Sequence, residues 1–400
     1  MSTKPVCRAL RFLLALLLAS GMLASCGGGD AASGVDSGGT GVSPFLASGP
    51  IAGFGSVILN DVRFEDAAAS VHDETGAAVP TDQLRLGMTA RVEASDATTV
   101  NGQQTATAHA VSISSELVGP VERIDATLGV FRVLGQTVVV TPATVFDVTL
   151  AGGPSRLMLG TVVEIHGQYN AATQRYVATR VAPLASPAAY KIRGVVASVD
   201  PVGRTMVVGG LSIGYASLAA NSVPNLAVGQ FVRVRLALLP VAGVWTALSV
   251  VSGQAQIPDH PRARLIGRIS SLTSTTSFAV DGVLVDASAV ASAAANTGIV
   301  LGARVLVEGP IRLGVLNATI VAVKGDESLA NISFELHGPI MTIDTVAQTL
   351  SVRGITVHYS GQVQFQAGVI GDLAVGRRIK VIGSLSTDAT GLQAQVIAFE

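Results

Sequence analysis

Short segments of alternating apolar and polar residues, each introduced by a turn glycine, recur along the chain. The segment from Leu159 to Gly167 is one of them and reads LGTVVEIHG. Alternation with a period of two residues is typical of a β-strand with one buried face. The turn glycines of the copies are Gly87, Gly160, Gly229, Gly302 and Gly376, at spacings of 73, 69, 73 and 74 residues. This period predicts one β-unit repeated five times.

A second glycine opens the first strand of each unit and keeps the same period. The opening glycines are Gly49, Gly119, Gly194, Gly267 and Gly338, at intervals of 70, 75, 73 and 71 residues. Two independent markers thus agree on the repeat length. The expected domains are repeat 1 (49–118), repeat 2 (119–190), repeat 3 (191–262), repeat 4 (263–334) and repeat 5 (335–400).

The order of signals inside a unit predicts its architecture. A glycine-led strand, a turn, a second strand, a two-residue hairpin such as Asp281-Gly282 and a third strand come first. An irregular stretch follows, which in repeat 4 is rich in alanine (287–295) and could hold one or two helical turns. The strand after the turn glycine is the fourth, and a polar loop leads to the fifth. We therefore expect an all-β protein of five tandem small β-barrels, OB-like or alternatively SH3-like.

Composition supports a folded β protein. The 400 residues are 49% hydrophobic and 13% charged, with 44 glycines, so enough apolar surface exists to offset chain entropy. Units of about 70 residues bury a limited share of their surface, which predicts that neighbouring units support one another.

Residues 1–25 have the features of an export signal. Lys4, Arg8 and Arg11 precede an apolar run, which ends in Leu23-Ala24-Ser25-Cys26. This ending is similar to the lipobox of bacterial lipoproteins. The resemblance implies a lipoprotein signal peptide over 1–25, cleavage before Cys26, and diacylglycerol and a fatty acid such as palmitate on Cys26. No Asp follows Cys26, which by the same resemblance favours the outer membrane.

Residues 26–48 are rich in glycine and serine and show no hydrophobic periodicity. We expect a lipidated cysteine and a flexible tether there. For the segment before Cys26, the alternative to a signal peptide is a transmembrane helix, which is disfavoured because its apolar run is short and interrupted.

Repeat 1 departs from the common pattern. Its opening, Gly49-Pro50-Ile51-Ala52-Gly53-Phe54-Gly55, shortens the first hairpin, and the glycines at 53 and 55 are interpreted as serving tight turns. Together with the glycine-led strands and the alternating segments, this opening resembles a family of bacterial lipoprotein domains of unknown function (DUF 5666-like). The resemblance covers roughly residues 49–400. It implies a repeated β-domain on an envelope protein and supplies no catalytic residues.

Charge argues against a nucleic-acid partner. Without Lys4, Arg8 and Arg11, the mature chain has 23 basic and 27 acidic residues, a net charge of about −4. The chain has 1 Trp, 5 Tyr and 11 Phe, too few for a stacking groove. Cys7 lies in the expected signal peptide, so Cys26 cannot form a disulfide within the mature chain.

Few side chains form a candidate site. His72-Asp73-Glu74 is the densest group of potential metal ligands, but three adjacent residues rarely converge, which favours a solvated loop. Glu164, His166 and Glu308 are interpreted as residues on exposed strand faces. Trp245 could stack on a sugar but fits the interior of its own barrel better. We therefore predict no catalytic, cofactor-binding or metal-binding residues, and Cys26 as a lipidation site.

These observations lead to a functional hypothesis. We expect a lipid-anchored envelope protein, periplasmic or surface-exposed, that is a non-enzymatic binding or structural module. We expect the lipid anchor to attach it to the membrane. A further partner could be an envelope glycan or a protein, and the sequence does not distinguish them. The alternatives are a glycan-acting enzyme with acids from adjacent repeats in a cleft, and an accessory subunit of an envelope assembly machine.

Overall fold

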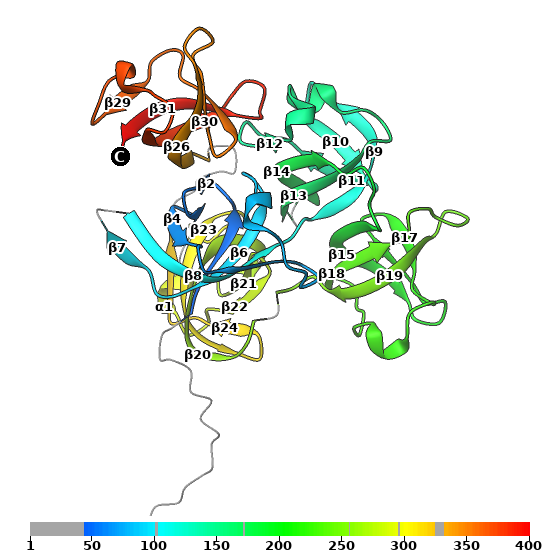
Figure 1. Ribbon diagram of the computed structural model, residues 1–400. Helices are drawn as coiled ribbons and strands as arrows, with labels where there is room; N and C mark the ends of the chain where they lie inside the picture. Colours follow the sequence, from blue (N-terminus) through cyan, green and yellow to red (C-terminus); the bar gives the residue numbers. More distant parts are fainter. Residues whose placement is uncertain (1–43, 101–102, 171–172, 256, 295–296, 325–331) are drawn as a thin grey trace, which may run out of the picture. The chain divides into compact units, whose positions relative to one another are not determined.

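The computed structural model describes residues 44–400, except 101–102, 171–172, 256, 295–296 and 325–331. Its strands form two hydrogen-bonded sheets, one of 20 strands and one of 11. Each sheet curls into small closed barrels of five principal strands, labelled in Figure 1. The predicted signal peptide (1–25), the lipidated Cys26 and most of the predicted tether lie outside the described residues.

Barrel 1 covers residues 45–113. Its strands are β1 (Phe45–Pro50), β2 (Gly53–Phe54), β3 (Val57–Leu59), β4 (Val62–Glu65), β5 (Ser70–Asp73), β6 (Thr89–Ala94), β7 (Thr98–Val100) and β8 (Gln103–Ile113), with the 3-10 turn η1 (Thr81–Gln83) before β6. β1 and β2 together act as the first strand. The ladder closes as β2–β3–β4–β8–β6–β1, and β4 runs parallel to β8.

Barrel 2 covers residues 117–183 and repeats this order. Its elements are β9 (Leu117–Asp125), β10 (Val130–Val133), β11 (Gln136–Val139), β12 (Val145–Phe146), η2 (Val148–Leu150), η3 (Gly153–Arg156), β13 (Val162–Asn170) and β14 (Arg175–Pro183). The ladder runs β9–β10–β11–β14–β13–β9, with β11 parallel to β14.

Barrel 3 covers residues 190–252. Its elements are β15 (Tyr190–Asp200), β16 (Thr205–Val208), β17 (Leu211–Gly214), η4 (Ala220–Ser222), β18 (Phe231–Leu236) and β19 (Trp245–Ser252). The ladder runs β15–β16–β17–β19–β18–β15, again with a parallel third and fifth strand.

Barrel 4 covers residues 260–323. Its elements are β20 (His260–Ser274), β21 (Ser277–Val280), β22 (Val283–Asp286), α1 (Ala291–Ala294), β23 (Arg304–Arg312), β24 (Val315–Asn317) and β25 (Ile320–Val323). β24 and β25 are two pieces of the fifth strand, and β22 runs parallel to β24. α1 confirms the helical turn expected in the alanine-rich stretch.

Barrel 5 covers residues 334–399. Its elements are β26 (Phe334–Asp344), β27 (Thr349–Val352), β28 (Ile355–His358), β29 (Gln364–Gln366), η6 (Ile370–Asp372), β30 (Arg378–Leu385) and β31 (Leu392–Phe399). The ladder runs β26–β27–β28–β31–β30–β26, and β28 runs parallel to β31.

The turn glycine of the recurrent segment holds the first and fourth strands of each barrel together. Its amide donates to the carbonyl of a residue on the first-strand side, and the amide of that same residue donates back to the carbonyl of the residue directly after the glycine. The donor–acceptor pairs are Gly87–Ile51, Gly160–Val121, Gly229–Val196, Gly302–Ile269 and Gly376–Ile340, at 2.8–2.9 Å. The recurrent segment is therefore the turn and fourth strand, as its alternation predicts.

The second glycine of that segment also has a backbone role. In β13 the register shifts between His166 and Gly167, which marks a bulge. A Cβ on Gly167 would lie 2.2 Å from the carbonyl oxygen of Val177 on the next strand. Gly383 occupies the matching bulge of β30 and faces Gln393 in the same way. Only glycine allows this close approach.

The barrels join through their first strands. β1 pairs in parallel with β20 of barrel 4, and β2 pairs in parallel with β26 of barrel 5. β9 of barrel 2 meets β15 of barrel 3. Barrels 1 and 5 share one hydrophobic cluster, barrels 2 and 3 share a second, and barrel 4 supplies most of a third. Neighbouring barrels thus bury apolar surface for one another.

Barrel 1 begins earlier than its sequence suggests. The predicted tether over 26–48 is wrong in its last four residues, because Phe45–Ser48 belong to β1 and are buried. Phe45 and Ala47 pack in the cluster shared with barrel 5, while Leu46 points into the cluster of barrel 4. The segment is apolar on both faces since both faces are covered.

Gly55 lies in the turn between β2 and β3, as expected, whereas Gly53 lies in β2 itself, and both glycines have a further purpose. A Cβ on Gly53 would lie 2.2 Å from the carbonyl oxygen of Glu335, and one on Gly55 would lie 2.3 Å from Cβ of His337. Both glycines therefore allow barrel 1 to approach β26 of barrel 5. Gly55 in addition has a φ of 132°.

Candidate functional site

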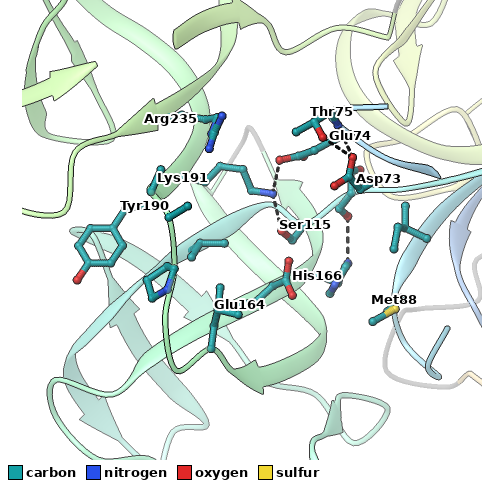
Figure 2. A pocket seen from close by; sticks show the side chains of 17 residues that line it. Asp73, Glu74, Thr75, Met88, Ser115, Glu164, His166, Tyr190, Lys191 and Arg235 are labelled. Carbon is teal, nitrogen blue, oxygen red and sulfur yellow. Dashed lines mark hydrogen bonds and ion pairs between the residues drawn. The ribbon is translucent and has the colours of Figure 1, made fainter. Parts of the chain in front are cut away.

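A cavity lined by several charged side chains lies where barrels 1, 2 and 3 meet. It has a volume of about 220 Å³ and is shown in Figure 2. Barrel 1 contributes the loop after β5, barrel 2 contributes β13, and barrel 3 contributes the start of β15. The ionisable residues that line it are Asp73, Glu74, Glu164, His166, Lys191 and Arg235.

Lys191 is the centre of an ion-pair network between barrels 1 and 3. Its Nζ lies 2.8 Å from Oε1 of Glu74 and 2.5 Å from Oγ of Ser115. Arg233 donates to the other oxygen of Glu74 at 3.2 Å. The Lys191 and Glu74 side chains are only 7% and 16% exposed, so little solvent screens this pair. The network holds the loop after β5 against the first strand of barrel 3.

The interpretation of His72-Asp73-Glu74 as a solvated loop is wrong in two respects, because His72 and Asp73 end strand β5 and Glu74 is largely buried. Asp73 accepts hydrogen bonds from the Thr75 amide at 2.8 Å and hydroxyl at 2.6 Å. Burial acts to raise the pKa of Asp73, but these bonds outweigh it and hold the pKa below its usual value. Glu74 points to Lys191, so the adjacent acids serve separate purposes.

His166 is buried between barrels 2 and 1, and its expected place on an exposed strand face is wrong. The Thr89 amide donates to its Nδ1 at 3.2 Å, and the Ser114 carbonyl oxygen lies 3.0 Å from the same nitrogen. Burial lowers the pKa of His166 to about 4. The imidazole is therefore neutral at neutral pH and serves as a fixed hydrogen-bonding group.

Glu164 also lines the cavity instead of an open surface. Burial acts to raise its pKa, but it is outweighed by His166, which becomes charged in the acidic range where Glu164 titrates, by a hydrogen bond from Ser115 and by the charge of Lys191. The pKa of Glu164 is therefore below its usual value, and its carboxylate stays ionised. Glu308, the equivalent acid of barrel 4, is 28% exposed and pairs with Arg264 at 2.8 Å.

A second joint contains the Asp281–Gly282 hairpin of barrel 4. Oδ2 of Asp281 accepts from the Arg268 amide at 2.9 Å, and Oδ1 lies 3.4 Å from Nε2 of Gln168 in barrel 2. Burial raises the pKa of Asp281 to about 7. The neighbouring acid Glu116 is bound to Arg193 at 2.5 Å. Neither acid lines the cavity that holds Glu164.

Another cavity, of about 350 Å³, lies between barrels 2 and 4 and is lined by Gln168, Tyr169, Asn170 and Arg268 among others. Tyr169 could in principle offer a stacking surface there. Its ring, however, contacts Tyr176 at 5.0 Å and Phe231 at 5.6 Å between centroids. Trp245, the other candidate for sugar stacking, packs edge-on against Tyr190 at 5.9 Å. Both rings thus contribute to packing.

In the described part of the chain, no three His, Cys, Asp or Glu side chains are grouped so as to hold a metal ion. No helix among residues 44–400, apart from the gaps given above, is long and apolar enough to cross a membrane. The predicted lipidation site, Cys26, lies outside this part.

The fold and the site define an all-β protein of small closed barrels whose charged residues meet at the joints between barrels. The family model described as "Domain of unknown function (DUF5666)" matches residues 118–182 and 337–398. Barrels 2 and 5 therefore each carry this domain, and the predicted repetition of a domain of unknown function is confirmed. No curated protein matches the chain.

Proposed function

We propose that the protein is a lipid-anchored component of the cell envelope and acts as a non-enzymatic binding or structural module. It is built from five tandem OB-like repeats. The strand order 1-2-3-5-4-1, with strands 3 and 5 parallel, supports an OB-like over an SH3-like barrel in each of the five segments. The sequence Leu23-Ala24-Ser25-Cys26 supports the anchor.

One observation carries the non-enzymatic role. The charged side chains of the cavity between barrels 1, 2 and 3 bind one another across barrels, as Lys191 does with Glu74. A catalytic acid needs a raised pKa, and a nucleophile needs a free approach. Glu164 and Asp73 instead have lowered pKa values. These groups are suited to fixing the barrels relative to one another.

A glycan-acting enzyme is the second candidate, because carboxylates from barrels 1 and 2 line the same cavity. Glu164→Gln separates the two functions. A glycosidase would lose at least about 100-fold in turnover of envelope glycan when its acid or nucleophile is replaced. For a structural or binding module, purified wild type and Glu164→Gln release no reducing ends from peptidoglycan. Turnover by wild type that Glu164→Gln abolishes would contradict the proposal.

Anchoring is tested at Cys26. The wild-type chain should be labelled by palmitate in growing cells and recovered with membranes. Cys26→Ser should be unlabelled and retain its uncleaved signal peptide. Label on Cys26→Ser would contradict the lipid anchor. Co-purification from solubilised membranes then distinguishes a binding module or assembly subunit, which brings a partner, from a module that has only a structural role.

A further inference from the structure

The loop between the fourth and fifth strands of barrel 3 is apolar and exposed. It joins β18 to β19 and reads LALLPVAGVW from Leu236 to Trp245. Leu239 is 77% exposed and Val241 is 72% exposed, and Leu238 beside them is 41% exposed. No charged residue occurs from Leu236 to Pro258. We name residues 237–244 the apolar tip.

The apolar tip is a formed hairpin. Val241 and Val244 exchange two backbone hydrogen bonds, at 2.9 and 3.0 Å. Ala242 and Gly243 between them have φ values of 50° and 80°, as a two-residue type I′ turn requires. The Ala237 amide binds the Thr246 carbonyl at 2.9 Å and closes its base. Its apolar side chains are therefore presented outward by an ordered backbone.

The corresponding loops of other barrels differ. In barrel 2 the loop is polar and runs from Asn170 to Gln174, and in barrel 5 it runs from Ser386 to Gly391. Barrel 4 has a single exposed apolar residue there, Leu313, between Arg312 and Gly314. Among barrels 2 to 5, a cluster of exposed apolar residues at this loop position thus occurs in barrel 3, while the exposed apolar pairs Met158-Leu159 and Val369-Ile370 lie before the fourth strands of barrels 2 and 5. Such clusters on soluble surfaces mark contact sites.

We propose that the apolar tip inserts into the surface of a lipid bilayer. This inference rests on the proposed function, since an acyl anchor at Cys26 keeps the chain beside a membrane. A narrow hairpin offers far less area than the roughly 800 Å² per partner of a stable protein interface. A bilayer accepts apolar side chains without a complementary shape, and burial of their area drives insertion.

Two neighbouring residues fit the same partner. Arg235 is exposed at the foot of the tip and also lines the cavity between barrels 1, 2 and 3, and its positive charge favours anionic headgroups. Trp245 is partly buried at the other side of the foot, and tryptophan is enriched at the depth of the headgroups in membrane proteins. Three apolar side chains enter the acyl region, and these two residues remain at its boundary.

Trp245 is the single tryptophan of the chain and serves as the reporter. The lipidated protein is reconstituted in phosphatidylcholine vesicles with brominated or unbrominated acyl chains. Bromine quenches tryptophan only on close approach. We expect lower Trp245 fluorescence in the brominated vesicles. Leu239→Ser and Val241→Ser should each lower the ratio of inserted to withdrawn tip by about tenfold. The double variant should fluoresce equally in both vesicles.

The matched control is Leu313→Ser, which removes a 93% exposed leucine from the corresponding loop of barrel 4. It should leave the quenching unchanged. Flotation with the vesicles reports the lipid anchor separately. Protein that floats without quenching keeps its anchor but overturns the proposal. If the chain does not float, the anchor fails, and fluorescence after addition of the same vesicles still decides insertion. A third outcome is that the wild type is not quenched and forms a dimer, whereas the double variant is a monomer. The tip would then bind a second copy of the chain, and the proposal would be overturned.

Discussion

The turn before the fourth strand has one backbone conformation in barrels 1 and 3 but opposite surroundings. The φ values of Gly87 and Gly229 are 78° and 85°. A Cβ on Gly87 would lie 2.2 Å from the carbonyl oxygen of Thr179 in barrel 2, whereas one on Gly229 would meet nothing within 4 Å. The residue before each glycine shows the same difference in burial. Leu86 is 4% exposed and Val228 is 68% exposed.

This difference shows that two separate constraints act on the turn glycine. The first is local and common to the barrels, because the residue that starts the fourth strand needs a positive φ. The second constraint comes from a neighbour, because the turn of barrel 1 docks on strand β14 of barrel 2. There Thr179 donates its hydroxyl to the Gly87 carbonyl at 2.6 Å. Barrel 1 also contacts barrels 3, 4 and 5, so it touches all four other barrels. Barrel 2 does so as well, because it also meets β15 of barrel 3, Asp281 of barrel 4 and Ala389 of barrel 5.

The largest expected effect separates the two turn glycines. Gly87→Ala strains the backbone and also forces Thr179 away, so we expect it to lower the free energy of unfolding by more than about 3 kcal/mol. Gly229→Ala carries the backbone strain alone and should cost about 1 kcal/mol. Urea denaturation of both variants measures the difference. Equal losses would mean that the turn of barrel 1 does not dock on barrel 2.

The next effect is a pH dependence at the same joint. His166 has a pKa of about 4 in the folded protein, against 6.5 for an ordinary histidine. As the pH falls, the unfolded chain therefore takes up the proton first. The contribution of His166 to stability is complete above about pH 6.5 and declines as the pH drops towards 4, by up to about 3 kcal/mol.

Denaturant titration of wild type and His166→Gln gives their unfolding free energies at intervals of about half a pH unit from pH 7.5 to pH 4. The difference between the two free energies isolates the effect of His166. The difference should shrink or change sign as the solution becomes acidic. His109→Gln is the control, because His109 is exposed on β8 of barrel 1. A difference that is flat across this range would show that His166 is not buried against barrel 1.

A smaller effect is expected from the hydroxyl that binds the docked turn. Thr179→Val leaves the Gly87 carbonyl without its 2.6 Å partner and should cost about 1–2 kcal/mol. Thr319 occupies the corresponding position of barrel 4, where its hydroxyl binds the Glu308 carbonyl at 3.0 Å in an exposed setting. Thr319→Val should cost less than about 0.5 kcal/mol. A reversed order would contradict the contrast between docked and free surfaces.

The sequence contained the information for each barrel. Turn glycines such as Gly160 and hairpin pairs such as Asp281-Gly282 require positive φ angles that few other residues adopt, so they mark strand ends directly. Alternation then identifies the strands between them. The repeat period, the order of strands and the helical turn near Ala291 all follow from such local signals.

The joints could not be predicted in the same way. Alternation shows which side chains leave a barrel's own core, but not whether another barrel covers them. His166 and Glu164 were expected on open faces for this reason and are instead enclosed between barrels. The apolar run from Phe45 to Ala47 was the one available signal, because a strand that is apolar on both faces must be covered on both.

A double-mutant cycle between Glu74 and Lys191 tests most directly whether barrel 1 holds the others in place. These residues are 117 positions apart in the chain and lie in barrels 1 and 3, with Nζ and Oε1 at 2.8 Å. The unfolding free energies of Glu74→Gln, Lys191→Met and the double variant give their coupling. We predict a coupling of at least about 1 kcal/mol. A coupling of zero within error would mean that barrels 1 and 3 do not meet, and would contradict the account.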